Sequence, residues 1–88
     1  MHRATVGFWE GYAGLPEVIR RRADKQFALL KANPHHPSLQ FKKLGDREGQ
    51  EVWSARVTLS YGALAMRRKD GYLRFWIGDH RVYEELIS

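Results

Sequence analysis

The chain has 88 residues, of which 43% are hydrophobic and 28% are charged, and it contains no cysteine. This length suits a single domain, residues 1–88, with a core that needs no crosslinks; the lack of cysteine excludes disulfides, thiolate metal sites and a cysteine nucleophile. No apolar run approaches the roughly 18–20 residues of a membrane-spanning helix, and the first residues lack the apolar segment of a signal peptide. We therefore expect a cytoplasmic protein that does not associate with membranes.

Basic residues outnumber acidic residues, fifteen against ten, which gives a net charge of +5. Residues 1–44 hold eight basic and three acidic residues, whereas residues 45–88 hold seven of each. A domain this basic commonly binds nucleic acid. The charge also suits an acidic protein partner, or solubility alone, and the composition leaves all three possibilities open.

The first half of the chain predicts a short strand over residues 2–6 and two helices. Residues 8–14 fit a short helical turn. A longer helix begins at Pro16, because a proline in the first turn loses no hydrogen bond. It ends at Asn33, because the residue before a proline disfavours helical backbone. Apolar residues at helical spacing predict the buried face of this helix: Val18, Ile19, Ala23, Phe27 and Leu30.

The second half of the chain alternates apolar and polar residues, which predicts strands with one buried face. The clearest run covers residues 52–61, and further strands fit residues 61–68 and 72–77. Asp70-Gly71 predicts the hairpin turn between the last two strands. Residues 39–44 are another candidate strand, and residues 80–87 fit a short helix or an extended tail. The apolar face of the first run holds its odd-numbered residues: Trp53, Ala55, Val57, Leu59 and Tyr61.

This order of elements predicts an α+β fold. A small antiparallel sheet carries two N-terminal helices packed on one face, and the other face of the sheet stays open.

Basic and aromatic side chains converge on the predicted open face. Arg56 lies at a polar position of one strand, Arg74 and Trp76 lie on the last strand, and Lys42 and Lys43 lie near the first. Such a set suits RNA, because cations pair with phosphates and aromatic rings stack on unpaired bases. The alternative is a structural role, in which the tryptophan covers an apolar edge and the arginines are solvated.

The histidines and the known motifs limit the chemistry. His35 and His36 are adjacent in a loop bounded by prolines, and no carboxylate lies nearby in sequence, so we expect no metal site there. His80 follows the end of a strand and suits acid–base catalysis if basic residues and a cleft surround it, since its ordinary pKa is about 6.5. The sequence holds no nucleotide-binding loop and no serine-hydrolase or zinc-protease motif. We therefore expect no cofactor and no metal.

Several segments together resemble the RelE/ParE superfamily of toxins from type II toxin–antitoxin systems. The resemblance covers nearly the whole chain and implies a compact toxin that is neutralised by a cognate antitoxin. The segments that carry it are Phe8-Trp9 with Tyr12, Leu15-Pro16, Asn33-Pro34-His35-His36-Pro37-Ser38-Leu39-Gln40-Phe41-Lys42, Trp53-Ser54-Ala55-Arg56-Val57, Tyr61, Ala63-Leu64-Ala65, and Phe75-Trp76-Ile77-Gly78-Asp79-His80 with Tyr83.

The resemblance implies an activity. Many members of this superfamily are endoribonucleases that cut mRNA without a metal ion, often on the ribosome, and others inhibit DNA gyrase. The chain is therefore expected to be an mRNA endoribonuclease, a hydrolase that inhibits translation, with mRNA as its partner either on the ribosome or alone. The alternatives are a non-enzymatic toxin that inhibits a protein such as gyrase, an attenuated variant without catalysis, and a basic RNA-binding module.

The resemblance also assigns roles to residues. Arg56 corresponds to a phosphate clamp, His80 to the catalytic acid or base, and Tyr83 to a hydrogen-bond donor or a stacking ring. The weaker RNA-binding candidates are Lys42, Lys43, Arg74 and Trp76, and Glu51 is a further candidate base.

One position departs from the family pattern. Members commonly carry Tyr-Arg-Ala-Leu in the third strand, where this chain has Tyr61-Gly62-Ala63-Leu64. The family arginine contacts phosphate, so Gly62 occupies a catalytic position with no side chain. It is either a natural variant or a substitution that weakens the toxin, and it puts full catalytic competence in question.

Overall fold

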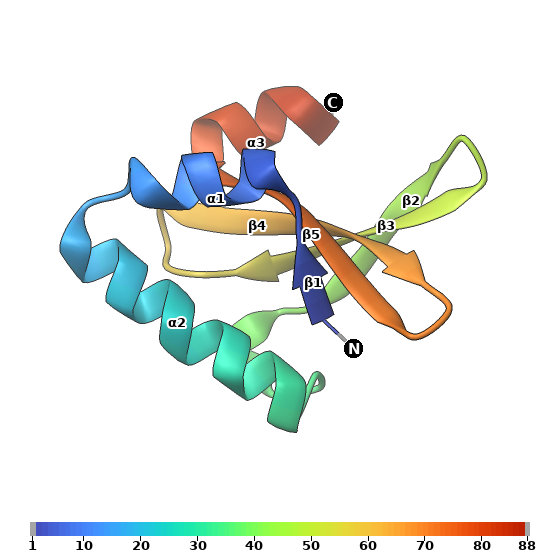
Figure 1. The fold of residues 1–88 in the computed structure, drawn as a ribbon, viewed down its shortest axis with the longest axis horizontal. Coiled ribbons are helices and arrows are strands. Elements are labelled where there is room, and N and C mark those ends of the chain that lie inside the picture. Colours follow the sequence, from blue (N-terminus) through green and yellow to red (C-terminus); the bar gives the residue numbers. More distant parts are fainter. Residues whose placement is uncertain (1, 88) are drawn as a thin grey trace.

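The computed structural model describes residues 2–87 and shows a five-stranded sheet with helices on both faces (Figure 1). The α+β class predicted from the sequence is confirmed. The strands are β1 (His2–Ala4), β2 (Lys42–Arg47), β3 (Gln50–Arg56), β4 (Tyr61–Arg68) and β5 (Gly71–Asp79). The helices are α1 (Val6–Ala13), α2 (Glu17–Ala32), the short 3₁₀ helix η1 (Pro37–Leu39) and α3 (His80–Ile87).

The strand order is β1-β5-β4-β3-β2. Strands β2 to β5 form the predicted antiparallel meander. The sheet as a whole is mixed, because β1 pairs with β5 in parallel. A parallel pair needs a long connection, and here everything from α1 to β4 lies between the two partners in sequence. The first strand therefore closes one edge of the sheet beside the last.

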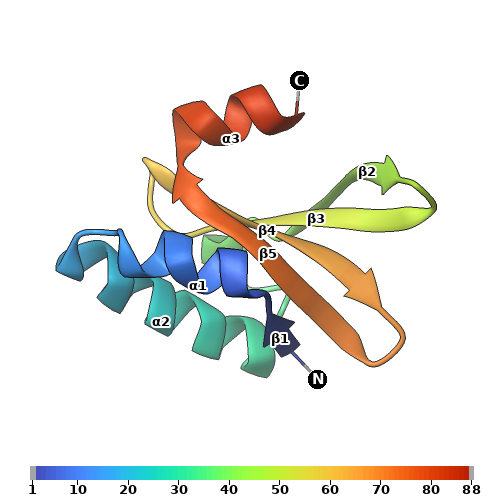
Figure 2. The same ribbon diagram turned by 45° about the horizontal axis from the view of Figure 1, so that its top comes forward.

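Helices α1 and α2 cover one face of the sheet, as predicted, and α3 crosses the other (Figure 2). Thr5 caps α1, because its hydroxyl accepts a hydrogen bond from the Phe8 amide at 3.1 Å. The core between these helices and the sheet is built around Phe8, Ala23, Phe27, Val57 and Ile77. Among residues 2–87, no helix is both long enough and apolar enough to cross a membrane.

Two aliphatic residues predicted to be buried are exposed, and the prediction is wrong at both. Leu59 is 82% exposed because β3 ends at Arg56 and the chain then turns. The amides of Val57 and Thr58 both donate to the Tyr61 carbonyl, which closes this turn. Val18 is 70% exposed because it lies at the edge of the α2 stripe that packs on the sheet.

A β-bulge in β5 changes which side chains of this strand face α1 and α2. Leu64 pairs with Trp76 but Ala65 pairs with Arg74, so Phe75 is the extra residue. An extra residue shifts the alternation of side chains by one. Arg74 therefore faces α1 and α2, on the same side as Ile77, while Trp76 faces α3.

Candidate functional site

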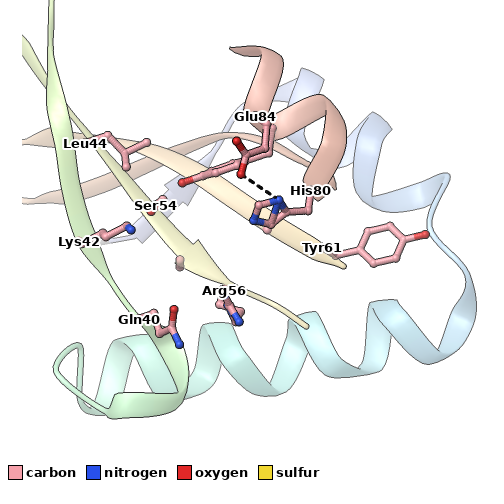
Figure 3. Close-up of a pocket in the computed structure, with 11 residues that line it drawn as sticks. Gln40, Lys42, Leu44, Ser54, Arg56, Tyr61, His80 and Glu84 are labelled. Atoms are coloured by element: carbon pink, nitrogen blue, oxygen red, sulfur yellow. Dashed lines mark ion pairs between the residues drawn. The ribbon is translucent and has the colours of Figure 1, made fainter. Parts of the chain in front are cut away.

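A pocket of about 160 Å³ lies between α3 and the ends of β2, β3 and β4 (Figure 3). The side chains that line it come from four elements and are mostly polar or charged. The lining residues include Lys42, Arg56, Gly62, His80, Tyr83 and Glu84. Helix α3 thus partly covers the sheet face that the sequence predicted to be open, and it contributes His80, Tyr83 and Glu84 to the pocket.

Strand register brings the two cations to this pocket. Lys42 pairs with Ser54 on β3, and Arg56 lies two residues further along the same strand, so Ser54 and Arg56 share a face. Arg56 in turn lies opposite Gly62 on β4. Within residues 2–87 no acidic side chain forms an ion pair with Lys42 or Arg56. Both charges are available to an anion in the pocket.

A buried amide fixes the end of β3 where Arg56 lies. Gln26 of α2 is only 3% exposed, and its Nε2 donates to the Arg56 carbonyl at 2.9 Å and to the Ser38 carbonyl at 3.2 Å. This side chain therefore joins α2, η1 and β3 at one point. Sequence reasoning missed it, because a glutamine among charged helical residues gives no signal of burial.

His80 is held at the start of α3 by two contacts. Its backbone amide donates to the Ser60 carbonyl at 2.7 Å. Its Nδ1 lies 3.5 Å from Glu84 Oε1, one helical turn along. The imidazole ring centre is 5.2 Å from that of Tyr83. Glu84 was also missed from the sequence, although the spacing of His80 and Glu84 by four residues would have revealed the pair once residues 80–87 were read as a helix.

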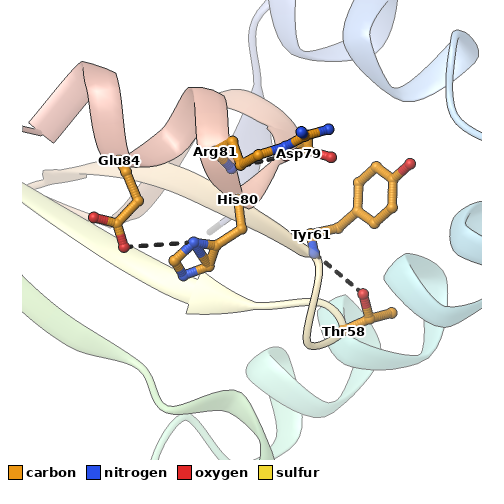
Figure 4. A network of polar contacts seen from close by, with 6 residues as sticks. All are labelled: Thr58, Tyr61, Asp79, His80, Arg81 and Glu84. Carbon is orange, nitrogen blue, oxygen red and sulfur yellow. Dashed lines mark hydrogen bonds and ion pairs between the residues drawn. The ribbon is translucent and has the colours of Figure 1, made fainter.

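Asp79 caps this helix (Figure 4). Its Oδ1 accepts a hydrogen bond from the Arg81 backbone amide at 2.8 Å and lies 3.5 Å from Arg81 Nε. The backbone hydrogen bond is the main cause of a lowered pKa of Asp79. Since the ionised carboxylate is favoured in the folded state, Asp79 stabilises the start of α3, and with it the position of His80.

We expect Asp79→Ala to loosen α3 at neutral pH. A carboxylate with a lowered pKa contributes stability above its ordinary pKa of about 3.9 and loses it as the pH falls through the folded value. The Ala variant should therefore be less stable than the parent at pH 7 and nearly equal to it in strong acid. Urea unfolding at both pH values, with amide exchange of residues 81–84, measures this. Asp79→Asn, which keeps an acceptor oxygen, is the control and should lose less.

The structure places Arg74 away from the pocket that holds the other predicted cations. The bulge at Phe75 turns it into the layer between sheet and helices, where it is 9% exposed. Its guanidinium carbon lies 4.3 Å from the ring centre of Phe27, 4.9 Å from Phe8 and 5.6 Å from Trp9. Burial lowers the pKa of Arg74. This arginine serves packing on the helix side of the sheet.

Arg74→Met is expected to leave the fold and its stability nearly unchanged. Cation–π attraction contributes about 2 kcal/mol when the cation is desolvated. Against this, Nε has no hydrogen-bond partner among residues 2–87, and an unsatisfied buried donor costs about 1–3 kcal/mol. The free energy of unfolding should stay within about 1 kcal/mol of the parent, since these effects offset each other. Urea unfolding of the two proteins measures this, and a variant far less stable than the parent would contradict the offset.

Three other predicted residues lie outside the pocket. Lys43 forms an ion pair with Asp46 at 3.4 Å. Trp76 faces α3 but packs on Tyr83, with 6.3 Å between ring centres. Glu51 does not line the pocket, and its Oε1 accepts a hydrogen bond from the Trp53 indole at 3.0 Å. The predicted residues that the pocket does bring together are Lys42, Arg56, Gly62, His80 and Tyr83.

One histidine of the proline-bounded loop, His36, stabilises the local structure. His36 Nδ1 accepts a hydrogen bond from the Ser38 amide at 3.2 Å and so caps η1. Among the described residues, no three histidine or carboxylate side chains group closely enough to hold a metal ion.

Solved structures with the same architecture include two toxin–antitoxin complexes. The RelE–RelB complex from Pyrococcus horikoshii OT3 superposes with a TM-score of 0.70 at 14% identity, over 89% of this chain and 91% of that chain. The RelB–RelE complex from Methanococcus jannaschii gives a TM-score of 0.73 at 13% identity, over 98% and 99%. The chain has the fold of the RelE toxins.

A third similar structure is a copper-bound mutant toxin from Helicobacter pylori. It superposes with a TM-score of 0.62 at 12% identity, over 92% of this chain and 94% of that chain. No protein-family model and no curated protein matches the sequence. The likeness therefore lies in the three-dimensional fold, and the pocket residues have to be argued from their own chemistry.

Proposed function

We propose that this protein is the toxin of a type II toxin–antitoxin pair and that it cuts mRNA without a metal ion. One observation carries the proposal: Lys42, Arg56 and His80, from β2, β3 and α3, line a single pocket. Two cations and an imidazole are groups that RNA cleavage without a metal ion can use. The RelE fold supports the same conclusion.

In the proposed reaction the ribose 2′-OH attacks the adjacent phosphorus. The 2′-O–P bond forms, the bond from phosphorus to the 5′-oxygen breaks, and a 2′,3′-cyclic phosphate and a 5′-hydroxyl result. One group takes the proton of the 2′-OH and another supplies a proton to the leaving oxygen. His80 performs one of these transfers, with its ring oriented by Glu84 at 3.5 Å. Lys42 and Arg56 stabilise the negative charge that builds up on the phosphate oxygens.

The proposed partner is a cognate antitoxin. Two of the similar structures are complexes of RelE with RelB, and the net charge of +5 suits an acidic protein. A small acidic protein encoded beside this chain should form a complex with it and suppress its effect on growth.

The test is cleavage of an RNA oligonucleotide and of ribosome-bound mRNA by the purified protein in excess EDTA. We expect products that end in a 2′,3′-cyclic phosphate, and no cleavage of a matched substrate with a single 2′-deoxy residue at the cut site. The deoxy substrate separates this chemistry from a contaminating nuclease that uses water. Growth inhibition without cleavage of either substrate would overturn the ribonuclease and point to inhibition of a protein target.

A further inference from the structure

Two exposed aliphatic side chains lie together in a groove beside α2. Val18 on α2 is 70% exposed, and Leu59 at the tip of the β3–β4 turn is 82% exposed. Both line a groove of about 610 Å³ between α2 and this turn. The apolar patterns of the sequence predicted both residues to be buried. Single exposed aliphatic side chains are common on folded domains, but two that line the same groove form an apolar strip that a partner can cover.

Basic side chains flank the aliphatic pair. Arg21, Arg22 and Lys25 lie three, four and seven positions after Val18, so they follow the same face of α2, and all of them line the groove. None of the lining residues is acidic. Glu17 forms an exposed ion pair with Arg21 at 2.8 Å, but among residues 2–87 no ion pair engages Arg22 or Lys25. The groove therefore combines apolar surface with two or three available positive charges.

The turn holds Leu59 in a defined position. Thr58 Oγ1 accepts hydrogen bonds from the amides of Ser60 and Tyr61, each at 3.1 Å (Figure 4). The Val57 amide donates to the Tyr61 carbonyl at 3.0 Å. A partner that covers Leu59 thus meets a preformed surface and loses little conformational entropy in ordering it.

We infer that this groove binds an amphipathic helix of a partner protein, with aliphatic residues along one face and Asp or Glu beside them. Leucine or isoleucine side chains at helical spacing would cover Val18 and Leu59, and carboxylates would pair with Arg22 and Lys25. RNA is the weaker occupant, because the groove offers aliphatic groups where unpaired bases need aromatic or guanidinium planes. The groove shares no lining residue with the His80 pocket.

The inference goes beyond RNA cleavage and rests on the proposed function only for the identity of the partner, the antitoxin. Because the groove and the pocket have separate linings, a helix bound in the groove would leave Arg56 and His80 uncovered. Binding of the helix in the groove therefore contributes to the affinity of the complex. To block the His80 pocket, the partner has to make a second contact there.

The experiment titrates the full chain, labelled with ¹⁵N, with a designed 16-residue helical peptide that carries leucines on one face and glutamates on the others. Amide shifts are expected at residues 17–25 and 57–60. A matched peptide with lysine at each glutamate should bind at least tenfold more weakly. Leu59→Asp should lower the affinity about tenfold or more, and Arg22→Glu combined with Lys25→Glu should do the same. Val6→Asp is the control, because Val6 is 75% exposed on α1 and outside the groove.

Four results would overturn the inference: no binding of the glutamate peptide at millimolar concentration, shifts confined to the His80 pocket, equal binding by Leu59→Asp and Val6→Asp, or groove shifts with an RNA oligonucleotide in place of the peptide. Since the assay measures binding alone, it gives an answer even if the protein cuts no RNA.

Discussion

His80→Ala is expected to lower the rate of RNA cleavage about 10²–10⁴-fold, the usual contribution of a positioned acid or base. His80 lines the pocket that also holds Arg56, and within residues 2–87 nothing engages its Nε2, while Nδ1 faces Glu84. Loss of the imidazole removes the proton transfer but keeps both cations. RNA binding, measured with the uncleavable 2′-deoxy substrate, should therefore change little. Single-turnover cleavage and growth inhibition on induction measure the two effects.

Glu84→Gln is the matched control for this prediction. It keeps the imidazole and removes the carboxylate that orients the ring, so we expect a smaller loss of rate than with His80→Ala. Arg56→Gln should weaken binding of the same deoxy substrate, which His80→Ala should not. A folded His80→Ala protein that cuts RNA within threefold of the parent rate would rule out His80 as the acid or base.

Local sequence signals were sufficient for most of the fold. Pro16 and Asn33 bracket α2 as predicted, because proline chemistry acts within one or two residues. Strand β4 covers residues 61–68 as predicted, and the Asp70-Gly71 signal fell within one residue of the hairpin turn between β4 and β5. These features depend on neighbours in sequence, so a single sequence can predict them.

The errors arose where the register between strands decides the outcome. Alternation along residues 72–77 placed Arg74 beside Trp76, but the bulge at Phe75 separates them onto opposite faces. Nothing local to Phe75 indicates the bulge, because it depends on how β4 and β5 pair. Leu59 was placed in a strand because the turn that interrupts it contains neither glycine nor proline. Its signal was Thr58, whose hydroxyl caps the turn.

The candidate site was predicted only in part, because some of its residues are recognised by their contacts in space and not by their type. Lys42, Arg56 and His80 were named because each carries its chemistry in its side-chain type. Glu84 and Gln26 were missed because a carboxylate or an amide becomes informative only when its neighbour in space is known. Gln26 reaches a carbonyl 30 residues away in sequence, which no periodicity reveals.

Gly62→Arg is expected to raise the rate of RNA cleavage. Gly62 lines the pocket and lies opposite Arg56. A Cβ there would lie 3.5 Å from the Ala55 carbonyl oxygen and 3.9 Å from Tyr83 Cδ2, both ordinary contacts, so the first atom of a side chain fits. An arginine fork could then hold two phosphate oxygens. A donor placed where transition-state charge develops is worth about 2.7–4 kcal/mol, or roughly 10²–10³ in rate.

The effect on stability should be small, because two contributions oppose each other. Replacing a glycine inside a strand raises the free energy of unfolding by about 0.5–1 kcal/mol. Two arginines directly opposite each other on neighbouring strands repel and lower it by a similar amount. Gly62→Ala is the control: it gains the strand contribution without the charge, so it should be slightly more stable than the parent and no more active. Urea unfolding and single-turnover cleavage of all three proteins test this. An Arg variant that is folded but no faster than the Ala variant would show that position 62 does not contact the reacting phosphate.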